Sequence, residues 1–327
     1  MAGQEVLSKE ISKKLSLFML GFIFIVVLFH SKFRYVYPFI EDLTAISTSY
    51  FFCISAFFFY RGLHSENTLA RLKKRCITLL LPYILWNLIY IVLYLRIYKF
   101  SFEHIIRSIT ISPICTPSWY LVTLFIFFLP SSFIRRGFSK VPTMIILLMA
   151  GLSISYLGYI RFQAELASLP FVGGYLVRMA EYVTPYLIGG MIGTWFEKNI
   201  SVSWKRSILG IVSGCGIIWL LCNDISVEAR WFLWVIFPII LWNAVPEKIF
   251  KKINFLHIFT APAFFINMLH CYLLFIVGLL INENEILKGT YYFAFKVIIA
   301  VMASYAIYYL LKLGMPKTLK LITGNRT

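Results

Sequence analysis

His30 closes a long apolar stretch near the start of the chain, and an imidazole is well suited to moving protons near neutral pH. The stretch KKLSLFMLGFIFIVVLFH, from Lys13 to His30, starts with two lysines and then stays apolar. As a helix it carries His30 roughly 22 Å beyond Leu15, at about 1.5 Å per residue. His30 could therefore be a general base for a hydroxyl group, or it could simply hydrogen-bond a neighbouring helix.

A second histidine, His270, lies in the middle of the apolar run APAFFINMLHCYLLFIV. A histidine at such a depth usually faces the interior of a helix bundle. It either bonds a neighbouring helix for stability or lines a substrate path, and spacing alone does not choose between them. Asn267 lies one helical turn earlier on a similar face and shares both interpretations.

The densest basic segment is RGLHSENTLARLKKR, from Arg61 to Arg75. Clustered guanidinium and ammonium groups pair well with phosphates, so Arg61, Lys74 and Arg75 are candidates for holding a nucleotide-bearing donor such as an acyl-CoA. The alternative is ordinary contact with lipid head groups. Trp119 opens another apolar run after Ser118, where it could line a substrate path or belong to an interfacial aromatic belt.

The composition indicates lipid as the solvent around these residues. Of 327 residues, 60% are hydrophobic and 14% are charged, against about 25% charged in a soluble domain. The mean hydropathy is +0.81. The net charge of +17 does not indicate nucleic-acid binding, because the basic residues form short clusters between apolar runs. The six cysteines include no CxxC pair, so we expect no disulfide framework and no metal site.

The apolar runs predict an all-α, polytopic integral membrane helix bundle of about ten transmembrane helices, forming a single domain over 1–327. The predicted spans are 15–34, 43–60, 76–97, 118–134, 142–160, 179–196, 207–223, 230–246, 261–281 and 290–312.

Basic residues divide unequally between the two sides of this arrangement. The side that holds both termini has 21 lysines and arginines and the other side has 9, which places both termini in the cytoplasm. The acids, Asp42 and Glu181 among them, fall outside or near the outer boundary. We interpret them as solvated loop residues, or as the outer mouth of a site.

Six stretches occur in a fixed order: VVLFH ending at His30, FFCISAFFFY at 51–60, LKKRCITLLLPYILWN at 72–87, PSWYLVTL at 117–124, PYLIGGMIG at 185–193 and FFINMLHCYLL at 264–274. Together they resemble the acyltransferase-3 family of membrane acyltransferases, which includes bacterial O-acetyltransferases of surface polysaccharides.

The resemblance implies transfer of an acyl group, usually acetyl from acetyl-CoA, to a sugar hydroxyl. It matches His30 to the family's first-span histidine, and Lys74 and Arg75 to its basic segment facing the donor's phosphates. Ser55 occupies the serine of the family's Ser-Gly pair and is a further candidate for the substrate path.

The chain departs from the family pattern at several positions. Met19 stands where an arginine is common, Ala56 replaces the glycine of the Ser-Gly pair, and Ile77 replaces a second basic residue. A close subgroup has Arg-Asp where this chain has Val122 and Thr123. Three basic residues could take over the lost charge: Lys32, Arg34 and Arg178.

The expected function is therefore a membrane O-acyltransferase of the cell inner membrane, with His30 at the reacting centre. Its co-substrate would be acetyl-CoA or another acyl-CoA, and its acceptor an envelope or extracellular polysaccharide or the lipid-linked precursor. The alternative is a non-catalytic protein that exports polysaccharide, which the loss of arginine at Met19 favours.

Overall fold

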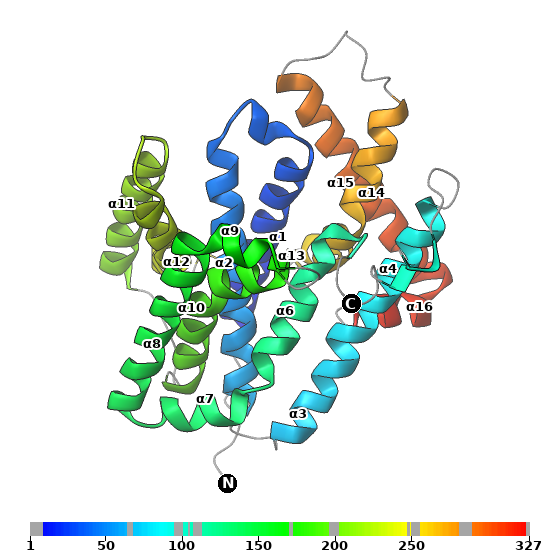
Figure 1. Ribbon diagram of the computed structural model, residues 1–327. Helices are drawn as coiled ribbons and strands as arrows, with labels where there is room; N and C mark the ends of the chain where they lie inside the picture. Colours follow the sequence, from blue (N-terminus) through cyan, green and yellow to red (C-terminus); the bar gives the residue numbers. More distant parts are fainter. Residues whose placement is uncertain are drawn as a thin grey trace. The chain divides into compact units, whose positions relative to one another are not determined.

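The computed structural model describes residues 9–63, 68–94, 101–103, 105–106, 113–169, 173–195, 203–246, 249, 256–280 and 290–324. Across these residues the regular structure is helical, and no strand occurs among them (Figure 1). The prediction of an all-α fold is confirmed.

Nine helices of the described residues have fourteen residues or more: α1 (Lys9–His30), α2 (Phe39–Gly62), α4 (Leu81–Tyr94), α8 (Val141–Ser155), α10 (Gly173–Trp195), α11 (Trp204–Leu221), α12 (Val227–Ala244), α14 (Ala263–Leu280) and α15 (Thr290–Gly314). The shorter ones are η1 (Phe33–Tyr35), α3 (Thr68–Arg75), η2 (Cys76–Leu80), η3 (Thr116–Ser118), α6 (Trp119–Phe128), α7 (Ser131–Phe138), η4 (Tyr156–Arg161), α9 (Gln163–Ala167), α13 (Leu256–Thr260) and α16 (Pro316–Thr323). Because η2 and η4 are π-helical, α3 to α4 and α8 to η4 each run as one continuous helix.

Eight described helices are long and apolar enough to cross a membrane, or up to nine if a bent pair, 116–128 and 131–138, forms one span. The predicted membrane helix bundle is confirmed. The remaining predicted span, 179–196, falls on α10, which is long but more polar because it carries Arg178 and Glu181. A helix enclosed by other helices can carry more polar residues, because little of its surface meets lipid. The predicted ends at 95–97, 196 and 281 lie outside the described residues.

The chain divides into two compact units. Unit 1 comprises residues 1–19, 41–71 and 126–257, and unit 2 comprises 20–40, 72–125 and 258–327. The divisions pass through the helices α1, α2, α3, α6 and α13, so no separate linker segment marks them. The expectation of a single domain stays a prediction.

Unit 2 is built around the contact of α14 with α15, while α16 packs against both α15 and α4. The indole nitrogen of Trp86 on α4 donates to the carbonyl of Ile322 on α16 at 2.9 Å. The ring of Phe265 on α14 meets Tyr308 on α15 edge to face, 5.8 Å between centroids. The turn η3 contacts both α4 and α14. These contacts fix α14, which carries His270.

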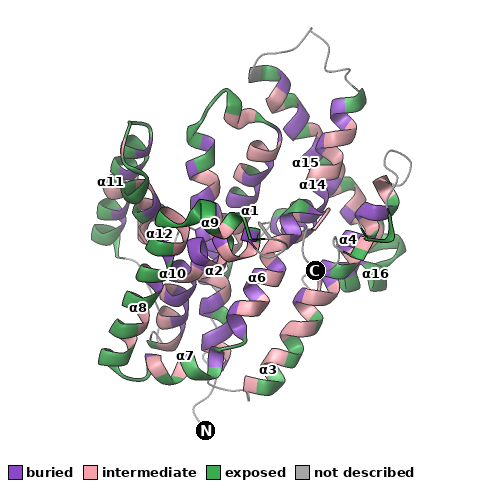
Figure 2. Cartoon of the chain, viewed as in Figure 1, coloured by how far each residue is buried: buried purple, intermediate pink, exposed green. Residues whose placement is uncertain are grey.

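In unit 1, α10 is the most enclosed helix, and it packs against α7, α8, α9 and α12 (Figure 2). Its glycines also allow close approach to α2. A side-chain carbon at Gly189 or Gly193 would collide with the carbonyl oxygens of Cys53 and Phe57. Small residues at helix contacts permit this approach in membrane proteins. The small-residue stretch PYLIGGMIG is therefore a packing surface.

Two charged groups of unit 1 are buried where the sequence predicted solvated acids. The Asp42 side chain is 4% exposed, pairs with Arg230 at 2.6 Å and accepts the indole N–H of Trp234 at 2.9 Å. Glu181 is also buried and lies 3.8 Å from Arg178. The prediction of solvated loop positions was wrong because the local sequence around an acid near a helix end does not show whether its partner is water or a distant arginine.

Lys14, which the charge count places at the cytoplasmic side, is also buried. Its ammonium group lies 4.0 Å from the ring centroid of Trp242 on α12 and donates to that residue's carbonyl. An aromatic face and a carbonyl are favourable partners for a desolvated cation. Lys14 therefore fastens α1 to α12 within unit 1.

We expect Asp42→Ala to lower the free energy of unfolding by about 2–4 kcal/mol, because the Arg230 guanidinium loses its carboxylate partner and the Trp234 N–H loses its acceptor. The measurement is thermal unfolding of the detergent-solubilised protein. The matched control is Glu41→Ala on the same turn, where the side chain is exposed and the change should stay within about 0.5 kcal/mol. Equal midpoints for the two variants would contradict the structural role of Asp42.

Candidate functional site

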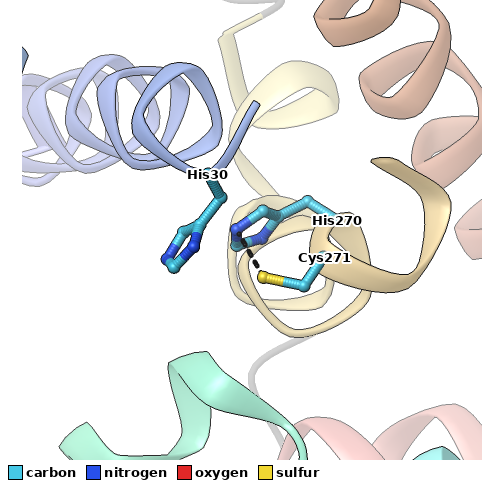
Figure 3. Close-up of side chains that lie close together, drawn as sticks. All are labelled: His30, His270 and Cys271. Carbon is cyan, nitrogen blue, oxygen red and sulfur yellow. Dashed lines mark hydrogen bonds between the residues drawn. The ribbon is translucent and has the colours of Figure 1, made fainter. Parts of the chain in front are cut away.

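Two histidines and a cysteine meet in unit 2, where the end of α1 faces the middle of α14 (Figure 3). The rings of His30 and His270 lie 5.1 Å apart between centroids, with 50° between their planes. Cys271 follows His270 on α14. The ligand-type nitrogen and sulfur atoms of the three residues all lie within 4.8 Å of one another. The structure thus brings together two site residues that are 240 positions apart in the sequence.

The hydrogen bonds of His270 determine which ring nitrogen carries the proton. His270 is fully buried, and its Nδ1 lies 3.1 Å from the carbonyl oxygen of Ile266. A carbonyl can only accept, so Nδ1 must be the donor, and in the neutral ring Nε2 carries the lone pair. The Nε2 atom lies 3.3 Å from Sγ of Cys271 (Figure 3). The thiol is therefore the donor in that contact, and the imidazole is the acceptor.

His30 is half-buried at the last position of α1. The helix stops there because Lys32 adopts a left-handed backbone, with φ of 72°, and Ser31 Oγ donates to the Leu28 carbonyl at 2.7 Å. The ring of Phe29 stands edge-on to His30, with centroids 5.2 Å apart. The guanidinium of Arg34 lies over the face of the Phe29 ring, 4.3 Å from the ring centroid. Of the three basic residues considered as replacements for the arginine missing at Met19, Arg34 is linked to His30 through this aromatic ring.

The other two replacement candidates lie elsewhere. Lys32 is exposed in the turn after His30, and Arg178 belongs to unit 1, where it faces Glu181.

The hydroxyl of Tyr90 enters the backbone of α14 beside the histidine. It donates to the Met268 carbonyl at 2.7 Å and accepts the N–H of Tyr272 at 3.2 Å. In a regular α-helix the Met268 carbonyl and the Tyr272 N–H bond to each other, so the hydroxyl contacts both members of one such pair. His270 and Cys271 lie between these two residues on α14. Tyr90 on α4 thus fixes the local backbone that presents both side chains.

Asn87 holds the start of α6 against α4. It is fully buried, accepts the backbone N–H of Cys115 at 3.1 Å and donates to the Ser118 hydroxyl at 3.1 Å and the Tyr83 carbonyl at 2.8 Å. The Cys115 thiol in turn contacts the Met268 carbonyl on α14 at 3.6 Å. This network positions α6, whose first residue, Trp119, is half-buried.

The remaining predicted site residues are spread along the chain. Asn267 is half-buried on α14, one turn before His270. Lys74 is exposed and Arg75 is half-buried at the end of α3. Ser55 and Arg61 belong to unit 1, in contrast to His30 and His270. The roles of these residues stay predictions.

Sequence analysis assigned no role to Tyr90, Asn87 or Cys271. Asn87 carries a signal in retrospect, since it is an amide inside the apolar run LPYILWN. The other two carry none: a tyrosine or a cysteine in an apolar run reads as core, and the His270–Cys271 pair has no spacing typical of a metal or nucleophile motif.

Chemically, the cluster offers an imidazole with a lone pair in contact with a thiol, and a second imidazole beside it. Such a set can accept and donate protons at a reacting oxygen or sulfur. Two imidazoles and a thiol are also ligands that Zn²⁺ or Cu⁺ accepts. The expectation that the chain holds no metal is untested.

A family model described as an acyltransferase domain matches residues 20–309. The match covers most of the chain, including both histidines and the basic end of α3. No curated protein and no solved structure matches the chain.

We expect Tyr90→Phe to lower the free energy of unfolding by about 1 kcal/mol, because the hydroxyl's two hydrogen bonds to the Met268 and Tyr272 backbone groups are lost. Thermal unfolding measures this, and hydrogen exchange should show altered protection at Tyr272. Tyr291→Phe is the control, since that side chain is 88% exposed in the same unit. Unchanged exchange at Tyr272 would contradict the hydrogen bond from its backbone N–H to the Tyr90 hydroxyl.

Proposed function

The chain belongs to the acyltransferase-3 family, and from this premise we propose that it transfers an acetyl group from cytoplasmic acetyl-CoA to a hydroxyl of a polysaccharide. The acceptor would be an envelope or extracellular polysaccharide, or its lipid-linked precursor. The reaction would take place in the cell inner membrane, with both termini in the cytoplasm.

The observation that carries the proposal is the meeting of His30 and His270 inside a membrane helix bundle. His30 takes the proton from the acceptor hydroxyl as its oxygen attacks the acyl carbon. The thioester sulfur leaves with the bonding electron pair and receives the proton that His30 took from the hydroxyl. General-base assistance of this kind needs a group whose proton affinity lies near working pH, and imidazole meets that requirement.

The donor would be held at the basic end of α3. Lys73, Lys74 and Arg75 occupy its last turn, and clustered cations pair well with phosphates. The helix then passes into the π-helical segment η2, which leads to Pro82 on α4. A π-helical segment is a common feature of functional sites in helical proteins. These features support a phosphate-bearing donor on the cytoplasmic side.

The orientation rests on charge. The side holding both termini carries more than twice as many basic residues as the other, as cytoplasmic loops do. In that orientation α3 lies at the cytoplasmic end of its continuous helix, and His30 lies at the outer end of the first span. The rival function, export of polysaccharide without chemistry, is favoured by the loss of an arginine at Met19 and by the few acids predicted to lie inside the bundle. It makes no use of a bound CoA, so donor binding separates the two.

We expect His30→Ala to reduce acetyl transfer by about 10²- to 10⁴-fold, since a general base contributes that range. The measurement is transfer of labelled acetyl from acetyl-CoA to glycan in membranes that contain the variant. His30→Gln is the companion variant, because it keeps a polar side chain of similar length without the base, and it should be equally slow. Full retention of transfer in either variant would overturn the role of His30.

We expect acetyl-CoA to raise the unfolding midpoint of the solubilised protein, because a ligand that binds only the folded state stabilises it, by about 2.7 kcal/mol at a hundredfold excess over Kd. Arg75→Ala should lose most of this rise. Ile77→Ala is the control, since it removes an exposed apolar side chain two residues away on the same continuous helix. No rise with acetyl-CoA or with longer acyl-CoAs would favour the export function.

A further inference from the structure

We infer that Cys271 carries the acyl group as a thioester between the two half-reactions, with His270 as its base. This inference rests on the proposed acyl transfer, which by itself requires only His30 and a donor. It assigns chemical roles to Cys271 and His270, which take no step in the proposed function.

The hydrogen-bond chain has the order that an activated nucleophile needs. The Ile266 carbonyl accepts from Nδ1 of His270, and Nε2 of the same ring contacts Sγ of Cys271 at 3.3 Å. A nucleophile in contact with a base, which a third group orients, is the recurring arrangement of covalent catalysis. The thiolate is the reactive form of cysteine, and Nε2 is positioned to receive the thiol proton.

The contacts of Tyr90 with α14 set Cys271 apart from the other described cysteines. Tyr90 holds the Met268 carbonyl and the Tyr272 N–H on either side of it. Cys271 is half-buried, whereas Cys115 in the same unit is fully buried. Its sulfur lies within 4.8 Å of a ring nitrogen of each imidazole (Figure 3).

The first half-reaction is an exchange between two thioesters. Sγ of Cys271 attacks the acetyl carbonyl carbon of acetyl-CoA as Nε2 of His270 takes its proton. The bond from carbon to the CoA sulfur breaks, and His270 returns the proton to that sulfur. One thioester replaces another, so the acyl group keeps its reactivity without any oxidant or metal.

The second half-reaction uses His30. It takes the proton of the acceptor hydroxyl, the oxygen attacks the acetyl carbon on Cys271, and the Cys271 sulfur leaves and recovers a proton from the imidazolium. An ester forms on the acceptor, and the thiol is regenerated. A carrier within the bundle also removes the need for donor and acceptor, which approach from opposite sides of the membrane, to be bound together.

The test is to trap the acyl-enzyme. Purified protein is incubated with acetyl-CoA labelled in the acetyl group, without acceptor, and then denatured. We expect label on the protein, release by neutral hydroxylamine as a thioester requires, and an acetylated peptide that contains Cys271. Cys271→Ala should lose the label, and transfer to glycan should fall by more than about 10³-fold. His270→Gln should slow the labelling while Cys271 is still present.

Cys53→Ala is the matched control, because Cys53 is equally half-buried on a membrane helix but lies in unit 1. It should label and transfer as the unaltered chain does. Unfolding midpoints near that of the unaltered chain show that the Cys271 variant is folded. Should Cys271→Ala be misfolded, the peptide assignment in the unaltered chain still decides.

The outcomes separate the two proposals. Transfer to glycan without label on Cys271, or transfer retained in Cys271→Ala, means direct attack on acetyl-CoA, which overturns the inference and leaves the proposed function standing. Neither transfer nor label overturns both. A transition metal found at one equivalent and lost in both Cys271→Ser and His270→Gln would make the cluster a metal site and overturn the nucleophile.

Discussion

A buried imidazole must find partners for both ring nitrogens, and the turn of α14 around His270 supplies them. The Ile266 carbonyl is the partner of Nδ1, and the Cys271 thiol is the partner of Nε2. On either side of this pair the Tyr90 hydroxyl donates to the Met268 carbonyl and accepts the Tyr272 N–H. In lipid an unpaired polar group costs several kcal/mol, and these bonds give the buried hydroxyl partners of its own. Tyr90 thus helps to fix the backbone that carries His270 and Cys271.

The same requirement explains the charges that the bundle buries. Asp42 keeps its position through Arg230 and Trp234, and Lys14 through the ring and carbonyl of Trp242. Each is a polar group whose water has been replaced by a defined partner from another helix. Such contacts specify which helices pack together, since lipid and helix interior are equally apolar and give little preference of their own. Glycines such as Gly189 then decide how closely the helices approach.

Sequence reasoning located the apolar helices and the two histidines because both depend on local properties: hydropathy over one helix length, and a titratable group inside it. It did not identify the partners. Asp42 lies 188 positions from Arg230, and Tyr90 lies 178 from Met268. No local pattern relates residues so far apart, and lipid imposes no periodicity that would separate an inward tyrosine from an ordinary core one. The failure at Asp42 has this cause. Cys271 is adjacent to His270, and it was missed because a cysteine in an apolar run is usually a core residue.

The departure at Met19 is consistent with the groups found beside His30. A guanidinium within a membrane bundle has to be paired at every donor, and its desolvation is costly. Neutral imidazoles and a thiol are cheaper to bury, and each can be satisfied by one backbone carbonyl or by each other. Arg34 is placed instead over the Phe29 ring at the end of α1, where its charge can still reach water.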